Sequence, residues 1–193
     1  MIENSGFPVG ELLSHLPARF ARDVEVISYF EERSASGLGK GVGEALMLDR
    51  LDSYVTECGH AYELVVKVTG RLIVRNAGLL LPHTVSSQDA FVRLRRDLTQ
   101  VDSRLFAVTP AILHEHLTGL AGQVDERNGR YLEHAVAERV LTGVGTGLNR
   151  RTFSVAPVFT GASGSTGAAY AGPRRLVEGL TETFRNRLPG DFL

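Results

Sequence analysis

The segment Leu64-Val65-Val66-Lys67-Val68-Thr69-Gly70-Arg71 sets the class of fold, because a strongly apolar run ends there in a lysine, a hydroxyl, a glycine and an arginine. A short apolar run bounded by a turn signal predicts a buried strand. In α/β proteins, ligands bind beyond the carboxyl ends of such strands. Two cations and a turn glycine at that position favour a phosphorylated ligand, which would neutralise the charges. The alternative is a turn whose charges are solvated.

The length and composition allow a single domain with a proper core. The chain has 193 residues, of which 43% are hydrophobic, and a formal net charge of -1. This balance argues against nucleic acid as the main partner, because binding to a phosphate backbone requires a basic surplus. The single cysteine, Cys58, excludes an internal disulfide and fits a reducing compartment. Since the sequence has no transmembrane segment and no signal segment, we expect a cytoplasmic protein.

Apolar blocks alternate with amphipathic ones along the chain, which predicts an α/β fold. We expect helices at residues 9–20, 43–58 and 130–141, with a further helix starting at Pro110. Residues 87–98 are basic and are predicted to be partly helical. Strands are predicted at residues 24–29, 62–69, 72–76, 104–109 and 153–159. The prediction is thus one α/β domain over residues 1–160, a Gly/Ala/Ser/Thr-rich loop at 161–173, and a C-terminal helix at 174–193 that packs on the same domain.

A glycine-rich loop precedes the helix at 43–58 and contains Lys40. It lacks the nucleoside-triphosphate P-loop pattern, because Lys40 is followed by Gly41 instead of serine or threonine. Its glycines also lack the Gly-x-Gly-x-x-Gly spacing of a dinucleotide site. Glycine amides, a lysine and a helix N-terminus can still hold an anion or close as a lid. The alternative is a flexible surface loop.

Several short motifs follow one another in a recognisable order. They are Glu3-Asn4-Ser5-Gly6, then Gly39-Lys40-Gly41-Val42-Gly43-Glu44-Ala45, Lys67-Val68-Thr69-Gly70-Arg71 with Asn76, Asp102-Ser103-Arg104-Leu105-Phe106, and Tyr131-Leu132-Glu133. This order resembles bacterial glycosyltransferase-like proteins of capsular polysaccharide, lipopolysaccharide or O-antigen assembly. The resemblance covers roughly residues 3–142 and implies a GT-A-like (Rossmann-like) fold. Its expected form is a mixed, mostly parallel central sheet flanked by helices, shortened at the N-terminus so that the first strand-helix unit is lacking.

The resemblance implies a nucleotide-sugar donor and a glycan or other hydroxyl acceptor. The residues that would bind the donor and its diphosphate are Asn4, Ser5, Gly6, Lys40, Lys67, Thr69 and Arg71. Fixed cations in a dry site stabilise the charge that develops on the leaving diphosphate. The residues that would contact the acceptor or shape the site are Asn76, Asp102 and Arg104. Since the chain contains no Asp-x-Asp pair, we expect neither a metal ion nor another cofactor.

Glu133 is the predicted general base. Inverting sugar transfer requires a carboxylate to accept the proton of the acceptor hydroxyl, and an acid near the start of a helix can be held there by local amides. The alternative is a solvated first-turn acid that simply interacts with the helix dipole.

Three functions remain open from the sequence. The first is sugar transfer, and the second is a non-catalytic nucleotide-sugar or phosphate-binding module that depends on a partner. The third is a structural or interaction domain. The missing first strand would leave a sheet edge open, which a homodimer or a partner subunit would cover.

Overall fold

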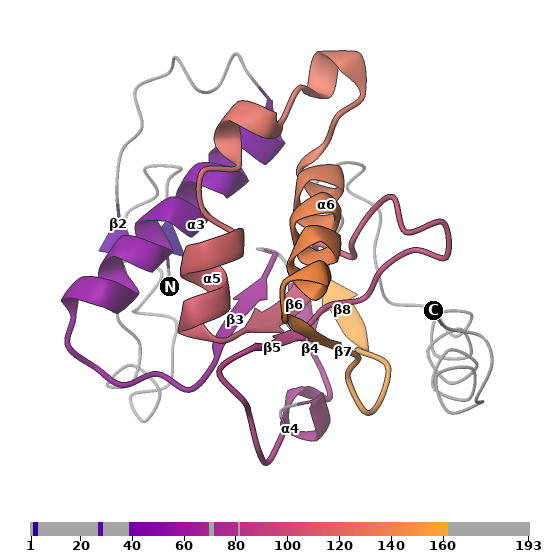
Figure 1. Cartoon of the computed structure of the whole chain (residues 1–193). Coiled ribbons are helices and arrows are strands. Elements are labelled where there is room, and N and C mark those ends of the chain that lie inside the picture. Colours follow the sequence, from indigo (N-terminus) through magenta and orange to yellow (C-terminus); the bar gives the residue numbers. More distant parts are fainter. Residues whose placement is uncertain (1, 4–26, 29–38, 70–71, 81, 162–193) are drawn as a thin grey trace. The chain divides into compact units, whose positions relative to one another are not determined.

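The computed structural model describes residues 2–3, 27–28, 39–69, 72–80 and 82–161 (Figure 1). These residues form a mixed α/β protein. They belong to two compact units, Met1–Gly59 with Leu117–Leu132 and His60–His116 with Glu133–Leu193. Several predictions lie outside the described residues: the helix at 9–20, the helix at 174–193, and the loop at 161–173 apart from Gly161, which ends a strand.

The first unit is built around α3 (Lys40–Glu57), which confirms the helix predicted at 43–58. Its buried side chains include Val42, Ala45 and Leu48, spaced for one face of a helix. The helix ends at Cys58, whose N–H donates to Tyr54 O, and Gly59 follows with a left-handed φ of 68°. The unit also contains a short parallel pair, β1 (Ile2–Glu3) with β2 (Ile27–Ser28), and two 3-10 helices, η2 (Ala121–Gln123) and η3 (Glu126–Asn128).

The second unit contains a four-stranded sheet in the order β3 (Val65–Val68), β6 (Leu105–Val108), β5 (Asp89–Phe91) and β7 (Asn149–Arg151). A separate antiparallel pair joins β4 (Leu72–Val74) to β8 (Phe159–Gly161). The strands predicted at 62–69, 72–76 and 104–109 are therefore confirmed as β3, β4 and β6.

The pairing of these strands is only partly parallel. Among the described strands, β5–β7 and β1–β2 are parallel, whereas β3–β6, β5–β6 and β4–β8 are antiparallel. Between β5 and β6 the chain folds back on itself, with Leu94 and Val101 in an antiparallel bridge and Arg95 N donating to Gln100 O, so the two strands run antiparallel. The mixed α/β class is thus confirmed, while a mostly parallel sheet is not seen in the described part of the chain.

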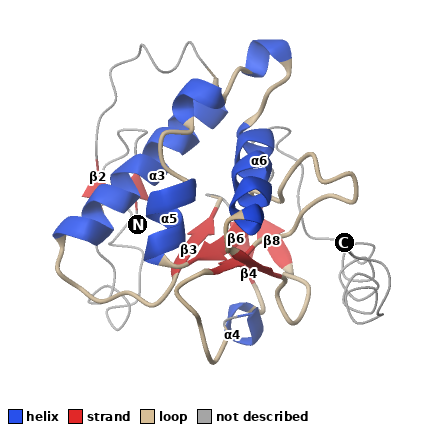
Figure 2. Ribbon diagram, in the orientation of Figure 1, coloured by secondary structure: helices blue, strands red, loops and turns tan. Residues whose placement is uncertain are grey.

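Helices cover both faces of the four-stranded sheet. In Figure 2, α5 (Pro110–His116) and α6 (Leu132–Gly145) lie on one side, and α4 (Ala77–Leu80) lies on the other. All four residues of β6 are buried, as expected of a central strand. Leu105 and Ala107 join a core cluster with Leu80 of α4, so the alternate residues of β6 point to the opposite face.

Two predicted elements are wrong. Residues 87–98 are not helical, because residues 89–91 form β5, paired on both sides, and the basic residues that follow lie in the connection to β6. The strand predicted at 153–159 is not seen as such: β7 ends before it, and β8 begins only at its last residue, Phe159. Pro157, which has no N–H to donate, lies in the irregular segment between those strands. No helix in the described residues is long and apolar enough to cross a membrane.

Candidate functional site

In the second unit, the side chains of Lys67, Thr69 and Glu133 all form hydrogen bonds with Ser103. Lys67 Nζ donates to Ser103 O at 2.5 Å and to Thr69 Oγ1 at 2.8 Å. Thr69 Oγ1 donates to the same Ser103 oxygen at 3.1 Å. Ser103 Oγ in turn donates to Glu133 Oε1 at 2.6 Å. We call Lys67, Thr69, Ser103 and Glu133 the Ser103 cluster, in which all four residues are half-buried.

The pairing of β3 with β6 explains how the cationic side of the cluster forms. Lys67 lies opposite Phe106 in the register, and Thr69 N donates to Arg104 O at 3.0 Å just beyond the last paired residues. This places the end of β3 beside the turn that leads into β6. The Lys67 ammonium also lies 5.9 Å from the centre of the Phe106 ring. The lysine stem therefore runs over apolar surface while its charged end reaches the turn.

The acidic side of the cluster comes from the start of α6. Glu133 lies in the first turn of this helix, where a carboxylate interacts favourably with the helix dipole. Val101 N donates to Glu133 O at 3.1 Å, so the segment that leads into β6 also holds the main chain of Glu133.

Asp102 and Arg104 flank Ser103 and hold its turn in place. Arg104 donates through Nε to Asp102 Oδ1 at 2.8 Å and through a terminal nitrogen to Oδ2 at 2.7 Å. Arg93 approaches the same carboxylate at 3.3 Å. Burial raises the pKa of Asp102, but the hydrogen bonds and charge of Arg104, with the charge of Arg93, outweigh it and hold the pKa below 3.8. Asp102 is thus ionised at neutral pH and tied to the strand that follows.

The charges around the cluster leave a small positive surplus. Lys67, Arg93 and Arg104 carry three positive charges, and Asp102 and Glu133 carry two negative ones, which gives a formal sum of +1. The guanidinium group of Arg104 also stacks on Phe159 of β8, 4.7 Å from the centre of the ring. Cationic side chains bind phosphoryl groups, and a positioned carboxylate can accept a proton. Both kinds of group are present here.

The other predicted site residues are placed as follows. Asn4, Ser5, Gly6 and Arg71 lie outside the described residues. Lys40 starts α3 in the first unit, is exposed, and lies 3.3 Å from Glu44 Oε1. Asn76 donates to Ala156 O at 2.9 Å and accepts from Val158 N at 2.8 Å, so its amide fixes the chain that leads into β8.

The N-terminus of α3 already has an acidic partner from the same unit. Gly41 N donates to Glu126 Oε1 at 2.5 Å. Gly39, the residue before the helix, has a φ of 106°, and a Cβ at that position would lie 2.5 Å from Glu126 Oε2. The two glycines are therefore needed for the close approach of this carboxylate. The N-terminal end of α3, considered from the sequence as an anion site, is occupied here by Glu126, and residues 34–38 of the glycine-rich loop lie outside the described residues.

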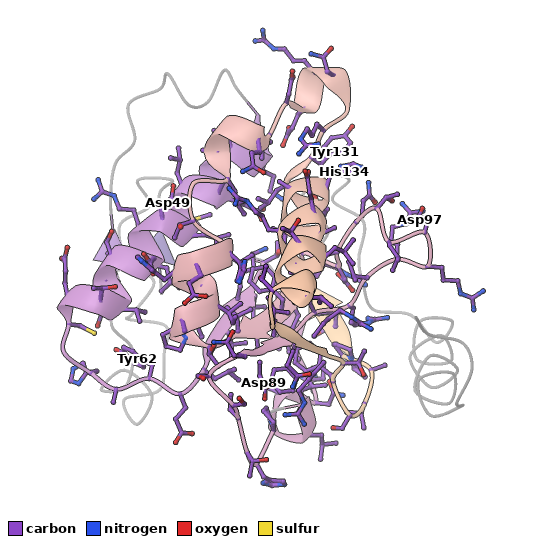
Figure 3. The ribbon with its side chains drawn as sticks, in the orientation of Figure 1. Asp49, Tyr62, Asp89, Asp97, Tyr131 and His134 are labelled. Carbon is purple, nitrogen blue, oxygen red and sulfur yellow. The ribbon has the colours of Figure 1, made fainter. Side chains whose placement is uncertain are left out.

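A second polar group, which the sequence reasoning missed, lies around Asp89 at the start of β5 (Figure 3). Asp89 is only 1% exposed and accepts from Ser86 N at 3.0 Å, from Asn149 Nδ2 at 2.6 Å and from Arg151 at 2.8 Å. Burial raises the pKa of Asp89, but these hydrogen bonds and the Arg151 charge lower it below 3.8. The signal in the sequence was an aspartate at the head of the apolar run Asp89-Ala90-Phe91-Val92.

Neither polar group offers a metal site. Within the described ranges there is no grouping of three or more His, Cys, Asp or Glu side chains that could hold a metal ion.

No protein-family model, curated protein or solved structure matches this chain. What the structure itself defines is a mixed α/β protein in which a half-buried lysine at the end of β3 and a half-buried glutamate are both hydrogen-bonded to Ser103.

Proposed function

We propose that the protein is glycosyltransferase-like and transfers a sugar from a nucleotide-sugar donor to a glycan or other hydroxyl acceptor without a metal ion. The observation that supports this most is the convergence of Lys67, Thr69 and Glu133 on Ser103. Lys67 and Thr69 lie two positions apart at the end of β3, whereas Glu133 comes from a distant part of the sequence. They were nevertheless selected from the sequence for complementary roles in sugar transfer.

In the proposed reaction, Glu133 accepts the proton of the acceptor hydroxyl as its oxygen forms a bond to the anomeric carbon of the donor sugar. The bond between that carbon and the diphosphate oxygen breaks, and the nucleoside diphosphate leaves with the electron pair. Negative charge therefore grows on the leaving group. Lys67 supplies a fixed positive charge that is bonded to the same residue, Ser103, as Glu133, and this charge favours the transition state more than the ground state.

Metal independence is part of the proposal. A divalent cation usually neutralises the diphosphate where an Asp-x-Asp pair holds it, and the chain has no such pair. The formal charge of Lys67, Arg93, Arg104, Asp102 and Glu133 sums to +1. This surplus supports the proposal that protein side chains, instead of a metal ion, neutralise the diphosphate. Arg71 belongs to the same proposed group, although it lies outside the described residues.

A second candidate is a nucleotide-sugar or phosphate-binding module without catalysis. The observation that favours it is that the Glu133 carboxylate already accepts a hydrogen bond from Ser103 at 2.6 Å. An acid used in this way can serve the structure of the turn alone. In that case the protein would bind the donor without converting it, or would do so only with a partner subunit.

Binding is tested by thermal denaturation with a panel of uridine, guanosine and cytidine nucleotides and their sugar conjugates, with and without Mn²⁺. A ligand that binds only the folded state raises the Tm. At a concentration of 100 times its Kd, it increases the free energy of unfolding by about 2.7 kcal/mol. For a chain of this length that is roughly 5–10 °C. A shift with one nucleotide family, independent of Mn²⁺ and lost in Lys67→Met but kept in the surface control Arg96→Met, supports the proposed site. No shift with any member contradicts both candidates.

Turnover separates the two candidates. Release of nucleoside diphosphate from the bound donor is followed with a panel of sugar acceptors and with water. We expect Glu133→Gln to lower kcat by about 100-fold or more, because it removes the proton acceptor and keeps the shape. Glu138→Gln, an exposed glutamate on the same helix, is the matched control. Binding without turnover in the unmodified protein would favour the second candidate.

The expected homodimer or partner subunit is also a proposal. Among the described strands, β3 lies at one end of its sheet, and its Val66 and Val68 side chains are 42% and 41% exposed. Light scattering across a range of concentrations tests it, since a stable monomer throughout would rule out the homodimer.

A further inference from the structure

We propose that Ser103 is a positioning residue that sets the Glu133 carboxylate for proton transfer and, through its carbonyl, anchors Lys67. This inference rests on the proposed function and deepens it. It assigns a role to a residue that acts through Glu133 and Lys67 and not directly on the substrate. The carbonyl and the hydroxyl of this one residue then fix the cation, Lys67, and the carboxylate, Glu133, of the same site.

Glu133 is held at two points by the three residues 101–103. Its carbonyl accepts from Val101 N at 3.1 Å, and its carboxylate accepts from Ser103 Oγ at 2.6 Å. The first contact fixes where α6 begins relative to this segment, and the second fixes the side-chain torsions. A first-turn glutamate without the second contact would sample several rotamers.

The carbonyl of Ser103 is the common acceptor on the cationic side. Lys67 Nζ and Thr69 Oγ1 both donate to it, and Lys67 also donates to Thr69 Oγ1. The position of the ammonium is thus set by the same residue that sets the carboxylate. A shift of this one residue would move both charged groups.

The turn that carries Ser103 is itself anchored from outside the cluster. Asp102 N donates to Arg93 O at 2.8 Å, and the Asp102 carboxylate is bound by Arg104 through two nitrogens. Thr69 N donates to Arg104 O on the other side. Ser103 is therefore held between two fixed neighbours, which is the arrangement a positioning residue needs.

This role predicts a specific kinetic effect. A general base acts only when its oxygen lies within hydrogen-bond reach of the proton it removes, and an error of 1 Å can cost about 100-fold in rate. Removing the Ser103 hydroxyl leaves its carbonyl, and hence the Lys67 contact, in place. We therefore expect loss of rate with little change in donor affinity.

The hydrogen bond is tested first, in a way that needs no activity. The Tm is measured for the unmodified full chain, Ser103→Ala, Glu133→Ala and the double variant. We expect Ser103→Ala to lower the Tm by about 2–4 °C when Glu133 is present and by less than about 1 °C when it is absent. Ser154→Ala is the control, since that hydroxyl donates to Leu79 O at 3.2 Å from an exposed position. Equal effects in both backgrounds overturn the proposal.

Catalytic positioning is tested next, on the donor that gives the largest thermal shift in the panel. Ser103→Ala should lower kcat by about 10- to 100-fold and leave the KM for the donor within about twofold. Ser103→Thr, which keeps a hydroxyl on Cβ, should restore most of the rate. The effects of Ser103→Ala and Glu133→Gln should not multiply in the double variant.

The outcomes are distinguishable. An unchanged kcat in Ser103→Ala, with turnover in the unmodified protein, overturns the positioning role and leaves the proposed function standing. A loss of rate that Ser103→Thr does not restore also overturns it, because the hydroxyl is then not the cause. If the unmodified protein binds donors without turning them over, the catalytic function fails, and the positioning role fails with it.

Discussion

Replacing Asp89 by alanine should destabilise the protein strongly, although Asp89 has no part in the proposed site. The change removes a carboxylate that is 1% exposed and accepts three hydrogen bonds, from Ser86, Asn149 and Arg151. At about 1.5 kcal/mol for each bond to a charged group, the three bonds together contribute about 4.5 kcal/mol. The Arg151 side chain is 41% exposed and can recover water, which reduces the expected loss to about 3 kcal/mol.

The measurement is the loss of far-ultraviolet circular dichroism on heating, because the chain has no tryptophan to report by fluorescence. A loss of about 3 kcal/mol corresponds to a fall in Tm of roughly 6–12 °C for a protein of this length. Asp89→Asn, which keeps the shape and one oxygen, should fall between Asp89→Ala and the unmodified protein. Asp97→Ala is the control, since Asp97 lies at the exposed tip of the connection between β5 and β6 (Figure 3).

The effect of Asp89→Ala should also depend on pH. The folded pKa of Asp89 lies below its ordinary value of 3.8, so the ionised form is favoured by folding. Its contribution is then fully present above pH 3.8 and is lost as the pH falls through the folded pKa. The Tm difference between the two proteins should be constant from pH 7 to about 5 and shrink below pH 3.8. A Tm within about 1 °C of the unmodified protein at pH 7 would refute the account of this buried carboxylate.

Three further substitutions test other close contacts. Gly39→Ala should lower the free energy of unfolding by about 2–3 kcal/mol, because it adds a Cβ 2.5 Å from Glu126 Oε2 at a φ of 106°; chemical denaturation measures this, and a neutral result would contradict the contact. Gly143→Ala should lower the Tm relative to Gly145→Ala, since its Cβ would meet Leu148 at 2.9 Å while nothing lies within 4 Å at Gly145; equal Tm values would count against the packing. Asn76→Ala should cost about 2 kcal/mol through its two backbone hydrogen bonds, and a loss of turnover without loss of stability would instead point to acceptor contact.

The elements that the sequence predicted correctly are those whose pattern is local. Helix α3 was predicted from an amphipathic pattern within residues 43–58, in which Leu48 is buried as expected, and it stops where Gly59 adopts a left-handed conformation. Strand β6 follows from the unbroken run Leu105-Phe106-Ala107-Val108, which is buried on both faces. Each of these signals lies within the segment that it describes.

The errors arose where tertiary pairing decides the structure. The basic residues after Val92 resemble the exposed face of a helix when read alone. The backbone bonds from Arg95 N to Gln100 O and from Asp102 N to Arg93 O instead fold them into an antiparallel connection. Leu98, at a φ of 59°, makes part of this turn without being a glycine, so composition gave no turn signal there.

The candidate site was predictable by residue type but not by arrangement. Lys67 and Thr69 stood out because charged and hydroxyl groups beside a strand end suit anion binding, whereas Glu133 was chosen because the resemblance to glycosyltransferases implies a general base. Ser103 did not stand out, because half of its role belongs to a backbone carbonyl that every residue has. The other half depends on α6 beginning beside the turn into β6. If Ser103 sets the geometry of both charges, the residue that controls the site is one that no side-chain pattern could identify, and only its removal can measure its contribution.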